Sequence, residues 1–271
     1  MSETTWDPTQ YARFGEERGR PFRDLLAQVG VSSPGVVVDL GCGNGPLTLT
    51  LADRWPHARV IGVDHSPEML TAARDLDAGG RVEWVEADLA TWDPARLDAP
   101  ADVVVTNATL QWVPAHLGLI DRAVGALAQR GWFAMQVPDN LDAPSHALMR
   151  EVAAAHPRAD ELAVAVGRLQ VEPPLAYLER LAALGCDVDV WSTTYFHVLD
   201  PEGQVEDPVL EWVRGTGLRP VLAVLTDVEE RDEFVSAYRL RLREAYPRTA
   251  AGVVLPFRRT FAVAHKRDRQ V

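Results

Sequence analysis

Apolar and polar residues along the first half of the chain form a pattern that predicts strands alternating with helices. Most of the predicted strands are short apolar runs rich in Val and Ile, which is typical of strands buried on both faces. The predicted strands are at residues 36–38, 59–63, 81–89, 102–106 and 131–137. The predicted helices are at residues 47–55, from Ser66 onward, and at 115–128. This order predicts an α/β fold with a doubly wound, mostly parallel sheet.

The second half of the chain is richer in helical periodicity. Two further strands are predicted at 186–199, where apolar and polar residues alternate, and at 253–264, which makes seven in all. Helices are predicted from 145 onward and at 175–184, 209–215 and 227–246, the third of them ending at 216–220. Residues 157–174 mix prolines, glycines and both polarities, so we expect a cap or lid segment there.

The first predicted strand runs into a glycine-rich turn that is the main candidate for ligand binding. Gly41, Gly43 and Gly45 follow Val36–Leu40 at alternate positions. Glycine has no Cβ, so the backbone can turn sharply there and come close to a ligand. Such a turn at the carboxyl end of a parallel strand is where nucleotide-like cofactors bind. A purely structural turn in some other α/β protein is the alternative.

The residues around the turn favour one cofactor over another. The dinucleotide pattern G-x-G-x-x-G is not met, because the third glycine comes one residue early and Pro46 stands in its place. Asp39 lies two residues before the first glycine, and its carboxylate suits a cation better than a pyrophosphate. S-adenosylmethionine carries an α-amino group and a sulfonium but no phosphate. The turn therefore favours S-adenosylmethionine, and an NAD-linked oxidoreductase is disfavoured.

Polar residues also end the next three predicted strands. Asp64 comes 21 residues after Gly43, close to the spacing at which an acidic residue meets ribose hydroxyls. Asp88 follows the third strand, where it can accept a hydrogen bond from an adenine amine. Asn107 ends the fourth strand. Because the carboxyl ends of parallel strands share one rim, these side chains should converge with Asp39.

These strand-end residues, in this order, resemble the motifs of class I S-adenosylmethionine-dependent methyltransferases. On this resemblance we expect a Rossmann-like fold with helical cap segments and no metal. Met69, beside Leu70, can pack near an adenine, and plain packing in the helix core is the alternative reading. The expected cofactor-binding residues are Asp39, Gly41, Gly43, Asp64, His65, Met69, Asp88, Leu89 and Asn107.

Charge and residue composition limit the classes of partner that the protein can be expected to bind. The net charge of −12 argues against a nucleic-acid partner, because phosphate binding requires a basic face. Two cysteines, Cys42 and Cys186, have neither disulfide nor metal spacing and indicate a reducing compartment. The N-terminus lacks a signal-peptide pattern, and no apolar run approaches membrane-spanning length. We expect a cytoplasmic monomer that binds a small molecule and neither nucleic acid nor a membrane.

Motifs outside the cofactor-binding region resemble the trans-aconitate 2-methyltransferase family. The resemblance extends from Trp6 to about Val263 and is weakest at 157–174. The motifs are Trp6-x-Pro8-x-x-Tyr11-x-x-Phe14-x-x-Glu17-Arg18-x-Arg20-Pro21, Asn107-Ala-x-Leu-Gln-Trp112, Gln136-x-Pro-Asp-Asn140, His146-x-Leu-Met-Arg-Glu-Val152, Val188-Asp-x-Trp191-x-Thr-Thr-Tyr195-x-His197 and Trp212-Val-x-x-Thr-Gly-Leu-Arg-Pro220. The resemblance implies methyl transfer to a carboxylate of trans-aconitate or a related tricarboxylate, giving a monomethyl ester and S-adenosylhomocysteine.

The resemblance also implies a domain organisation. We expect one methyltransferase domain over 1–271, with a cofactor-binding core at 31–138. The other expected segments are an N-terminal cap at 1–30, cap and substrate-site insertions at 139–185 and 200–250, and C-terminal strands at 186–199 and 252–265.

A polycarboxylate acceptor requires counter-charges and no general base. The reacting carboxylate has an ordinary pKa near 4 and is already ionised at neutral pH. We therefore expect no catalytic residue beyond those that position and desolvate the acceptor. Arginine suits the non-reacting carboxylates through its planar fork. The expected acceptor-binding residues are Tyr11, Arg20, Gln111, Tyr195, His197 and Arg219.

Two alternatives remain open from the sequence. The first is an O- or N-methyltransferase for another small molecule, which would require an acidic or basic catalytic group instead of several arginines. The second is a non-catalytic S-adenosylmethionine-binding protein, which would bind the cofactor without turnover.

Overall fold

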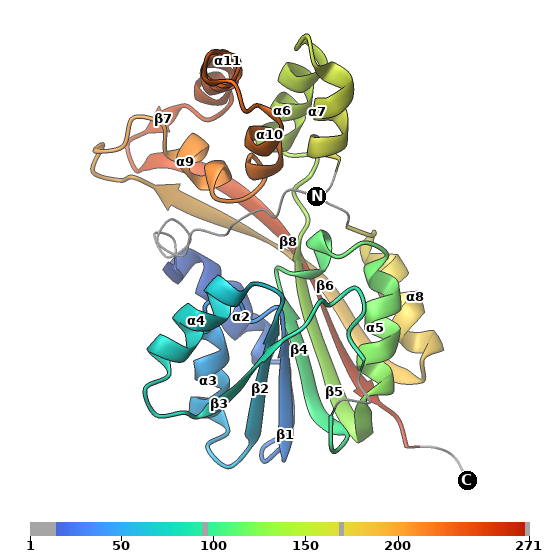
Figure 1. The fold of residues 1–271 in the computed structure, drawn as a ribbon. Helices are drawn as coiled ribbons and strands as arrows, with labels where there is room; N and C mark the ends of the chain where they lie inside the picture. The colour runs from blue at the N-terminus through green and yellow to red at the C-terminus, as the bar shows by residue number, and fades with distance from the viewer. Residues whose placement is uncertain (1–14, 94–96, 168–170, 269–271) are drawn as a thin grey trace. The chain divides into compact units, whose positions relative to one another are not determined.

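The computed structural model describes residues 15–93, 97–167 and 171–268 (Figure 1). The chain divides into two compact units. The first, which we call the sheet unit, consists among the described residues of 15–93, 97–137, 171–192 and 260–268. The second, the helical unit, consists of the described residues 138–167 and 193–259.

The described strands form one sheet in the order β3-β2-β1-β4-β5-β8-β6. The pairs β1–β2, β2–β3, β1–β4 and β4–β5 are parallel, which confirms the predicted doubly wound, mostly parallel fold. The strands are β1 Val36–Leu40, β2 Arg59–Asp64, β3 Val82–Glu86, β4 Ala101–Asn107, β5 Leu127–Pro138, β6 Cys186–Leu199 and β8 Gly252–Lys266. A two-residue β7, Arg248–Thr249, pairs antiparallel with β8, so the described residues contain one strand more than predicted.

Helices flank the strands of the sheet unit. α3 and α4 contact β2 and β3, whereas residues of α5 and α8 pack into a core that includes residues of β1, β4 and β5 (Figure 1). The helices of this unit are α2 Gly15–Leu26, α3 Pro46–Arg54, α4 Pro67–Leu76, η2 Leu110–Trp112, α5 His116–Gly125 and α8 Pro174–Ala183. Ser66 caps α4 as predicted, accepting the Met69 N–H at 3.3 Å.

The predicted boundary between the helix at 115–128 and the strand at 131–137 was wrong. α5 already ends at Gly125, and β5 begins at Leu127 because Leu127 pairs with Ala101. The register then shifts before Val103 pairs with Trp132, and Arg130 adopts a positive φ of 61° within this irregularity. Because the strand is interrupted there, the hydrophobic pattern of residues 131–137 does not extend back to Leu127, and the sequence predicted too late a start for β5.

The helical unit contains its own apolar core. Its helices are α6 Pro144–Ala154, α7 Ala159–Val166, α9 Pro208–Arg214, α10 Arg219–Val224 and α11 Val228–Ala245. Buried residues from all five pack together with Leu199, Leu255 and Phe257 of the long strands. Asp227 caps α11 by accepting the N–H groups of Glu229 and Glu230.

Two helices of this unit lie where the sequence did not predict them. α7 occupies the middle of the expected cap segment 157–174. α10 begins at Arg219, inside the stretch predicted to end the preceding helix, because Pro220 occupies its first turn and favours a helix start there. Within the described parts of the chain, no helix is both long and apolar enough to cross a membrane.

Candidate functional site

The glycine turn after β1 is held by hydrogen bonds to the end of β2. The Gly41 N–H donates to the Val63 carbonyl at 2.7 Å, and the Gly43 N–H donates to Asp64 Oδ2 at 2.9 Å. Gly41, Gly43 and Gly45 all have positive φ, at 83°, 55° and 88°. The turn thus requires the left-handed backbone that glycine adopts without strain.

The three glycines differ in how much space a side chain would find beside them. A Cβ at Gly41 would lie 2.2 Å from Thr109 Oγ1, and a Cβ at Gly45 would lie 2.7 Å from a ring carbon of Trp84. A Cβ at Gly43 would meet nothing within 4 Å. Gly41 and Gly45 are therefore required for packing, whereas Gly43 presents bare backbone to open space in which a ligand fits.

Two single substitutions, Gly43→Ala and Gly41→Ala, are expected to separate an effect on cofactor binding from an effect on folding stability. Gly43→Ala should weaken S-adenosylmethionine binding at least about tenfold, because its methyl group fills the open space, with a stability loss of about 1–2 kcal/mol from the positive φ. Gly41→Ala should lower the melting temperature far more, since its Cβ overlaps Thr109. Calorimetric titration and thermal unfolding measure the two effects. Unchanged cofactor affinity in Gly43→Ala would exclude a ligand at this position.

Asp39 is buried below the turn. It is 3% exposed, and its Oδ2 accepts the hydroxyl of Thr48 at 2.7 Å. Burial raises the pKa of Asp39 to about 7, the Thr48 hydrogen bond opposes this, and the nearby charge of Asp64 adds to it. A buried carboxylate with this pKa gains from a cationic ligand, which would favour its ionised form.

Asp64 is the last residue of β2, and its carboxylate interacts with Gly43, His65 and Ser66. Oδ1 accepts the Ser66 N–H at 3.0 Å and lies 3.4 Å from His65 Nδ1, while Oδ2 accepts the Gly43 N–H. Burial alone would raise its pKa, but the hydrogen bonds from His65, Ser66 and Gly43 outweigh it, and the pKa of Asp64 is lowered. Asp64 is therefore a permanent acceptor next to the open face of Gly43.

Unsatisfied polar atoms gather at the carboxyl end of β4. Thr106 Oγ1, Asn107 Oδ1 and Gln111 Oε1 are buried without a hydrogen-bond partner, although Gln111 Nε2 donates to the Ala108 carbonyl at 2.6 Å. Ala108 between them has a positive φ of 54°. Each such atom costs about 1–3 kcal/mol unless a ligand satisfies it. Hydroxyl and amide oxygens accept hydrogen bonds, so Thr106 and Asn107 could satisfy amino groups of S-adenosylmethionine, while Gln111 is the residue expected to bind the acceptor.

The other expected cofactor residues differ in exposure. Asp88 is exposed, and its Oδ1 accepts the Ala90 N–H at 2.8 Å, so the loop after β3 is shaped by this side chain. Leu89 and Met69 are buried at 5% and 4% exposure. The burial of Met69 agrees with packing in the helix core and with packing beside an adenine. Roles for these residues remain predictions.

The expected acceptor residues fall into separate parts of the chain. Tyr195 and His197 stack on one face of β6, with ring centroids 6.1 Å apart. Arg219 belongs to the same unit and is the first residue of α10, where its N–H donates to the Thr216 carbonyl at 3.1 Å. Gln111 and Arg20 belong to the sheet unit. Arg20 is exposed on α2, with Nε 3.8 Å from Asp24 Oδ2; Tyr11 lies outside the described residues.

Sequence reasoning missed the buried arginine of β8. Arg259 is 3% exposed and belongs to the helical unit. The signal was present in the sequence, because Arg259 continues an alternating row of apolar residues, Val253, Leu255 and Phe257. A cation at a position that the pattern reserves for an apolar side chain is a candidate for function.

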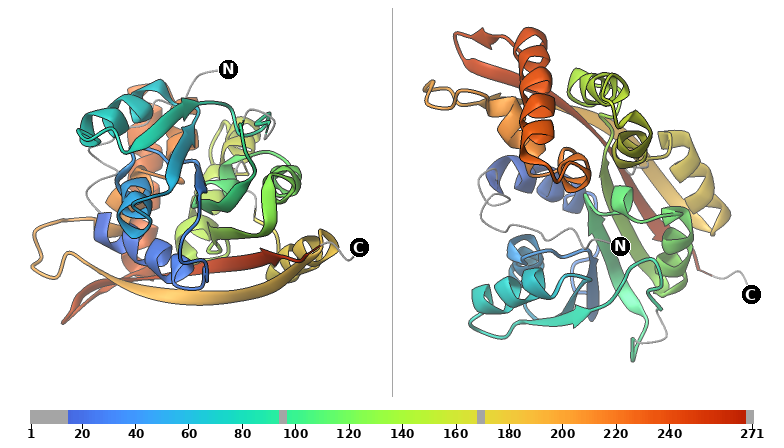
Figure 2. Two further views of the ribbon diagram at one scale, coloured as in Figure 1. Left: turned by 90° about the horizontal axis from the view of Figure 1, so that it is seen from below. Right: turned by 45° about the horizontal axis from the view of Figure 1, so that its top comes forward.

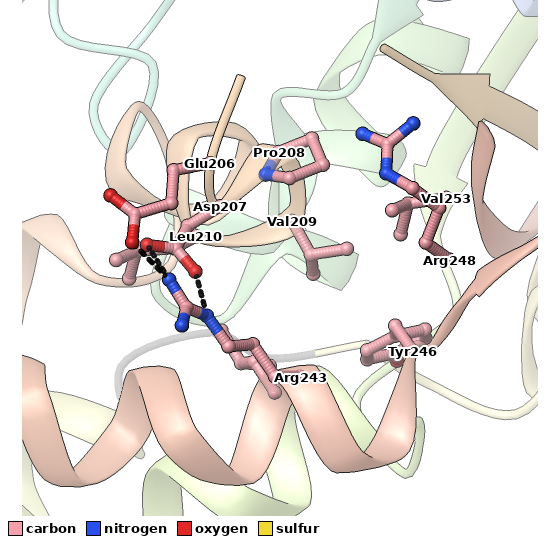
Figure 3. A pocket seen from close by; sticks show the side chains of 10 residues that line it. Glu206, Asp207, Pro208, Val209, Leu210, Arg243, Tyr246, Arg248 and Val253 are labelled. Carbon is pink, nitrogen blue, oxygen red and sulfur yellow. Dashed lines mark hydrogen bonds and ion pairs between the residues drawn. The ribbon is translucent and has the colours of Figure 1, made fainter. Parts of the chain in front are cut away.

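A pocket of about 210 Å³ in the helical unit is lined by residues of α9, α11, β7 and β8 (Figure 3). Arg243 points across it to Glu206 and Asp207, with 2.6 Å between Nη2 and Glu206 Oε1 and 2.6 Å between Nε and Asp207 Oδ1. Arg248 is bound to Asp200. Since carboxylates of the chain already hold both cations, this pocket does not offer a counter-charge for a polyacid.

Among the described side chains, no group of three or more His, Cys, Asp or Glu is placed to hold a metal ion. The expectation of a metal-free reaction remains a prediction.

Comparison with known proteins identifies the class. The family described as "Methyltransferase domain" matches residues 37–131, which include the glycine turn and the strand ends. Among solved structures, phosphoethanolamine N-methyltransferase 2 of Haemonchus contortus, in complex with S-adenosyl-L-methionine, is similar with a TM-score of 0.55. The two sequences are 16% identical, and the match covers 92% of this chain and 53% of that one. The fold is that of a class I S-adenosylmethionine-dependent methyltransferase.

Curated relatives give the family. The trans-aconitate 2-methyltransferase of Streptomyces avermitilis is 51% identical over 97% of this chain and 97% of its own length. The trans-aconitate 2-methyltransferase of Streptomyces coelicolor is 49% identical over 97% of this chain and 87% of its own. The chain belongs to the trans-aconitate 2-methyltransferase family.

Proposed function

We propose that the chain transfers the methyl group of S-adenosylmethionine to a carboxylate of trans-aconitate, giving a monomethyl ester and S-adenosylhomocysteine. The observation that carries the proposal is the 51% identity to a trans-aconitate 2-methyltransferase over nearly the whole chain. Related tricarboxylates are the expected poorer acceptors. No metal enters the proposed reaction.

The sheet unit supplies the groups that would hold the cofactor. The open backbone at Gly43, the permanent carboxylate of Asp64 and the buried carboxylate of Asp39 lie around one turn. The buried acceptor oxygens of Thr106 and Asn107 lie at the end of β4, the strand next to β1. Bound there, S-adenosylmethionine would supply a methyl group already activated by its sulfonium.

The chain need not supply a proton-transfer group. An ionised carboxylate oxygen attacks the methyl carbon, and the electron pair of the breaking carbon–sulfur bond stays on sulfur. The negative charge of the acceptor and the positive charge of the sulfonium are cancelled together, so no proton moves. Charge cancellation is favoured when water is excluded, and the contribution of the protein is therefore to position and desolvate the acceptor.

The helical unit supplies candidate groups for the acceptor. Tyr195 and His197 carry hydrogen-bonding groups on the buried face of β6, and Arg219 adds a cation at the start of α10. A tricarboxylate has two carboxylates that do not react, and donors of this kind are what they require. The positive charge here fits a polyacid better than an amine or phenol acceptor.

Incubation with saturating S-adenosylmethionine and a panel of acceptors tests the proposal. The panel contains trans-aconitate, cis-aconitate, isocitrate, simple dicarboxylates, an amine and a phenol. We expect trans-aconitate to give a monomethyl ester, detected by mass spectrometry as a gain of one methyl group, with the highest kcat/KM of the panel. Cofactor binding without any methylated product would support the non-catalytic alternative. Methylation of the amine or phenol alone would contradict the acceptor class.

A further inference from the structure

Arg122 of α5 holds the segment of chain that leaves β3. Its Nε donates to the Trp92 carbonyl at 2.8 Å, and its Nη2 donates to the carbonyls of Leu89 and Ala90 at 3.0 and 2.9 Å. Figures 1 and 2 show this segment running beside α5. Because a guanidinium is planar and rigid, these bonds leave the direction of each carbonyl little freedom. Arg122 therefore fixes residues 89–92 against the helix.

Asp88 holds the same segment from the opposite side. Its Oδ1 accepts the Ala90 N–H at 2.8 Å, and its backbone carbonyl accepts the Thr91 N–H at 3.1 Å. In a trans peptide the C=O and the N–H point in opposite directions. The two peptide groups on either side of Ala90 are therefore bonded to Arg122 on one side and to Asp88 on the other. All of these residues belong to the sheet unit.

Asp88 also lies next to the end of β2. The Ala87 N–H donates to the Asp64 carbonyl at 2.9 Å, so β2 and β3 stay paired up to the residue before Asp88. Asp64 is the residue expected to bind the ribose, and Asp88 is the one expected to accept from the adenine amine. The base of an adenosine is attached directly to its ribose, so the two positions match the order of the two groups. Because Asp88 is exposed, the direction of its carboxylate depends on the Ala90 N–H more than on packing.

We propose that Arg122 is a positioning residue that makes the protein selective for adenine as the base of its cofactor. It acts through Asp88, because the carbonyls that Arg122 fixes determine where the Ala90 N–H points, and this N–H holds the carboxylate toward the adenine amine. The proposal rests on the proposed function and names a residue that determines which cofactor is bound. A site built to accept a hydrogen bond from an amine rejects an analogue that lacks the amine.

Calorimetric titration with two ligands tests the proposal. S-adenosylhomocysteine carries the adenine amine, whereas S-inosylhomocysteine differs only in the base, where a carbonyl oxygen replaces the amine and N1 gains a proton. We expect the wild type to prefer the adenine ligand, because the carboxylate of Asp88 accepts from the amine and repels the carbonyl oxygen. In Arg122→Met this preference should shrink roughly 10- to 30-fold, the equivalent of one charge-assisted hydrogen bond.

Arg54 provides the matched control, because it braces backbone carbonyls in the same way elsewhere in the sheet unit. Its Nη1 and Nη2 donate to the carbonyls of Leu26 and Val29 at 2.8 and 2.9 Å, at the end of α2 and just after it. Arg54→Met should also lower the melting temperature, but the ratio of the two dissociation constants should stay within about twofold of the wild type. Arg122→Lys should recover part of the preference, because an ammonium can still donate to the carbonyls but lacks the rigid plane.

Asp88→Ala keeps the proposal testable if the Arg122 variants do not fold. This side chain is exposed, so the variant should fold, and it should lose at least as much of the preference for the adenine ligand as Arg122→Met. An unchanged preference in either variant would overturn the proposal. A preference that shrinks equally in Arg54→Met would also overturn it, and would leave Arg122 with a structural role alone. Wild-type protein that does not bind S-adenosylhomocysteine would instead refute the proposed function itself.

Discussion

Replacing Asp64 by alanine is expected to raise the dissociation constant for S-adenosylmethionine about 1,000-fold, the equivalent of two lost charge-assisted hydrogen bonds. Each oxygen of Asp64 already accepts one backbone N–H, from Ser66 and from Gly43. A carboxylate oxygen has two lone pairs, so Oδ2 can also accept a ribose hydroxyl, and Oδ1 can do so where the hydroxyl replaces the 3.4 Å contact with the exposed His65. The lowered pKa keeps Asp64 ionised, and this strengthens both bonds.

A matched control distinguishes lost contacts with the cofactor from lost hydrogen bonds to the backbone of the turn. Asp102 accepts the N–H groups of Gly35 and Val36 at 2.7 and 3.0 Å, so it braces the amino end of β1 as Asp64 braces the turn after it. Asp102→Ala should lower the melting temperature but leave the cofactor affinity unchanged. Calorimetric titration of both variants decides the question. If both lose affinity equally, Asp64 acts only by shaping the turn.

The sequence predicted the sheet well because the pattern of each long strand agrees with its burial. The strand predicted at 186–199 was confirmed residue for residue as β6. Elements without a pattern of their own were missed. β7 has two residues and exists through its pairing with Val253 and Gly252, and the start of β5 depends on Ala101 far away in the chain. Such contacts are tertiary and cannot be read from local periodicity.

For the site, residue types at strand ends could be predicted but their surroundings could not. Asp39 and Asp64 follow from the order of the strands, since parallel strands end on one rim. The difference between Gly41 and Gly43 depends on Thr109, which the fold brings to one of them and not to the other. Arg259 was visible as a cation in an apolar row, yet its burial and its place on Phe257 required the structure.

Asp39 is expected to make cofactor binding strongly pH-dependent. With a pKa of about 7, it is protonated in the cofactor-free protein below neutral pH. The cationic groups of S-adenosylmethionine favour the ionised form, so binding lowers this pKa. By linkage, affinity is constant above pH 7 and falls about tenfold for each pH unit below it, until the pKa of the complex is reached. Affinity at pH 5 should therefore be about 100-fold weaker than at pH 8.

Neighbouring groups provide the controls for this pH profile. Asp64 has a lowered pKa and burial raises that of Cys42, so neither titrates between pH 5 and 8. His65 lies beside Asp64, and His65→Gln should keep the pH dependence if Asp39 causes it. Asp39→Asn should bind weakly at every pH, with a flat profile. A profile in Asp39→Asn that still falls below pH 7 would assign the effect to another group.

The stability of the cofactor-free protein should show the opposite trend, which gives an independent readout. Because the folded pKa of Asp39 lies above its unfolded value of 3.8, the proton it binds stabilises the fold fully below pH 4. That stabilisation is lost as pH rises through 7, where the buried carboxylate must ionise. Asp39→Asn should therefore unfold at a higher temperature than the wild type at pH 8, and this difference should shrink steadily as the pH falls from 7 to 4. Asp39 would then be a residue that weakens the empty protein at the pH where it binds the cofactor best, as expected for a group selected for binding and not for stability.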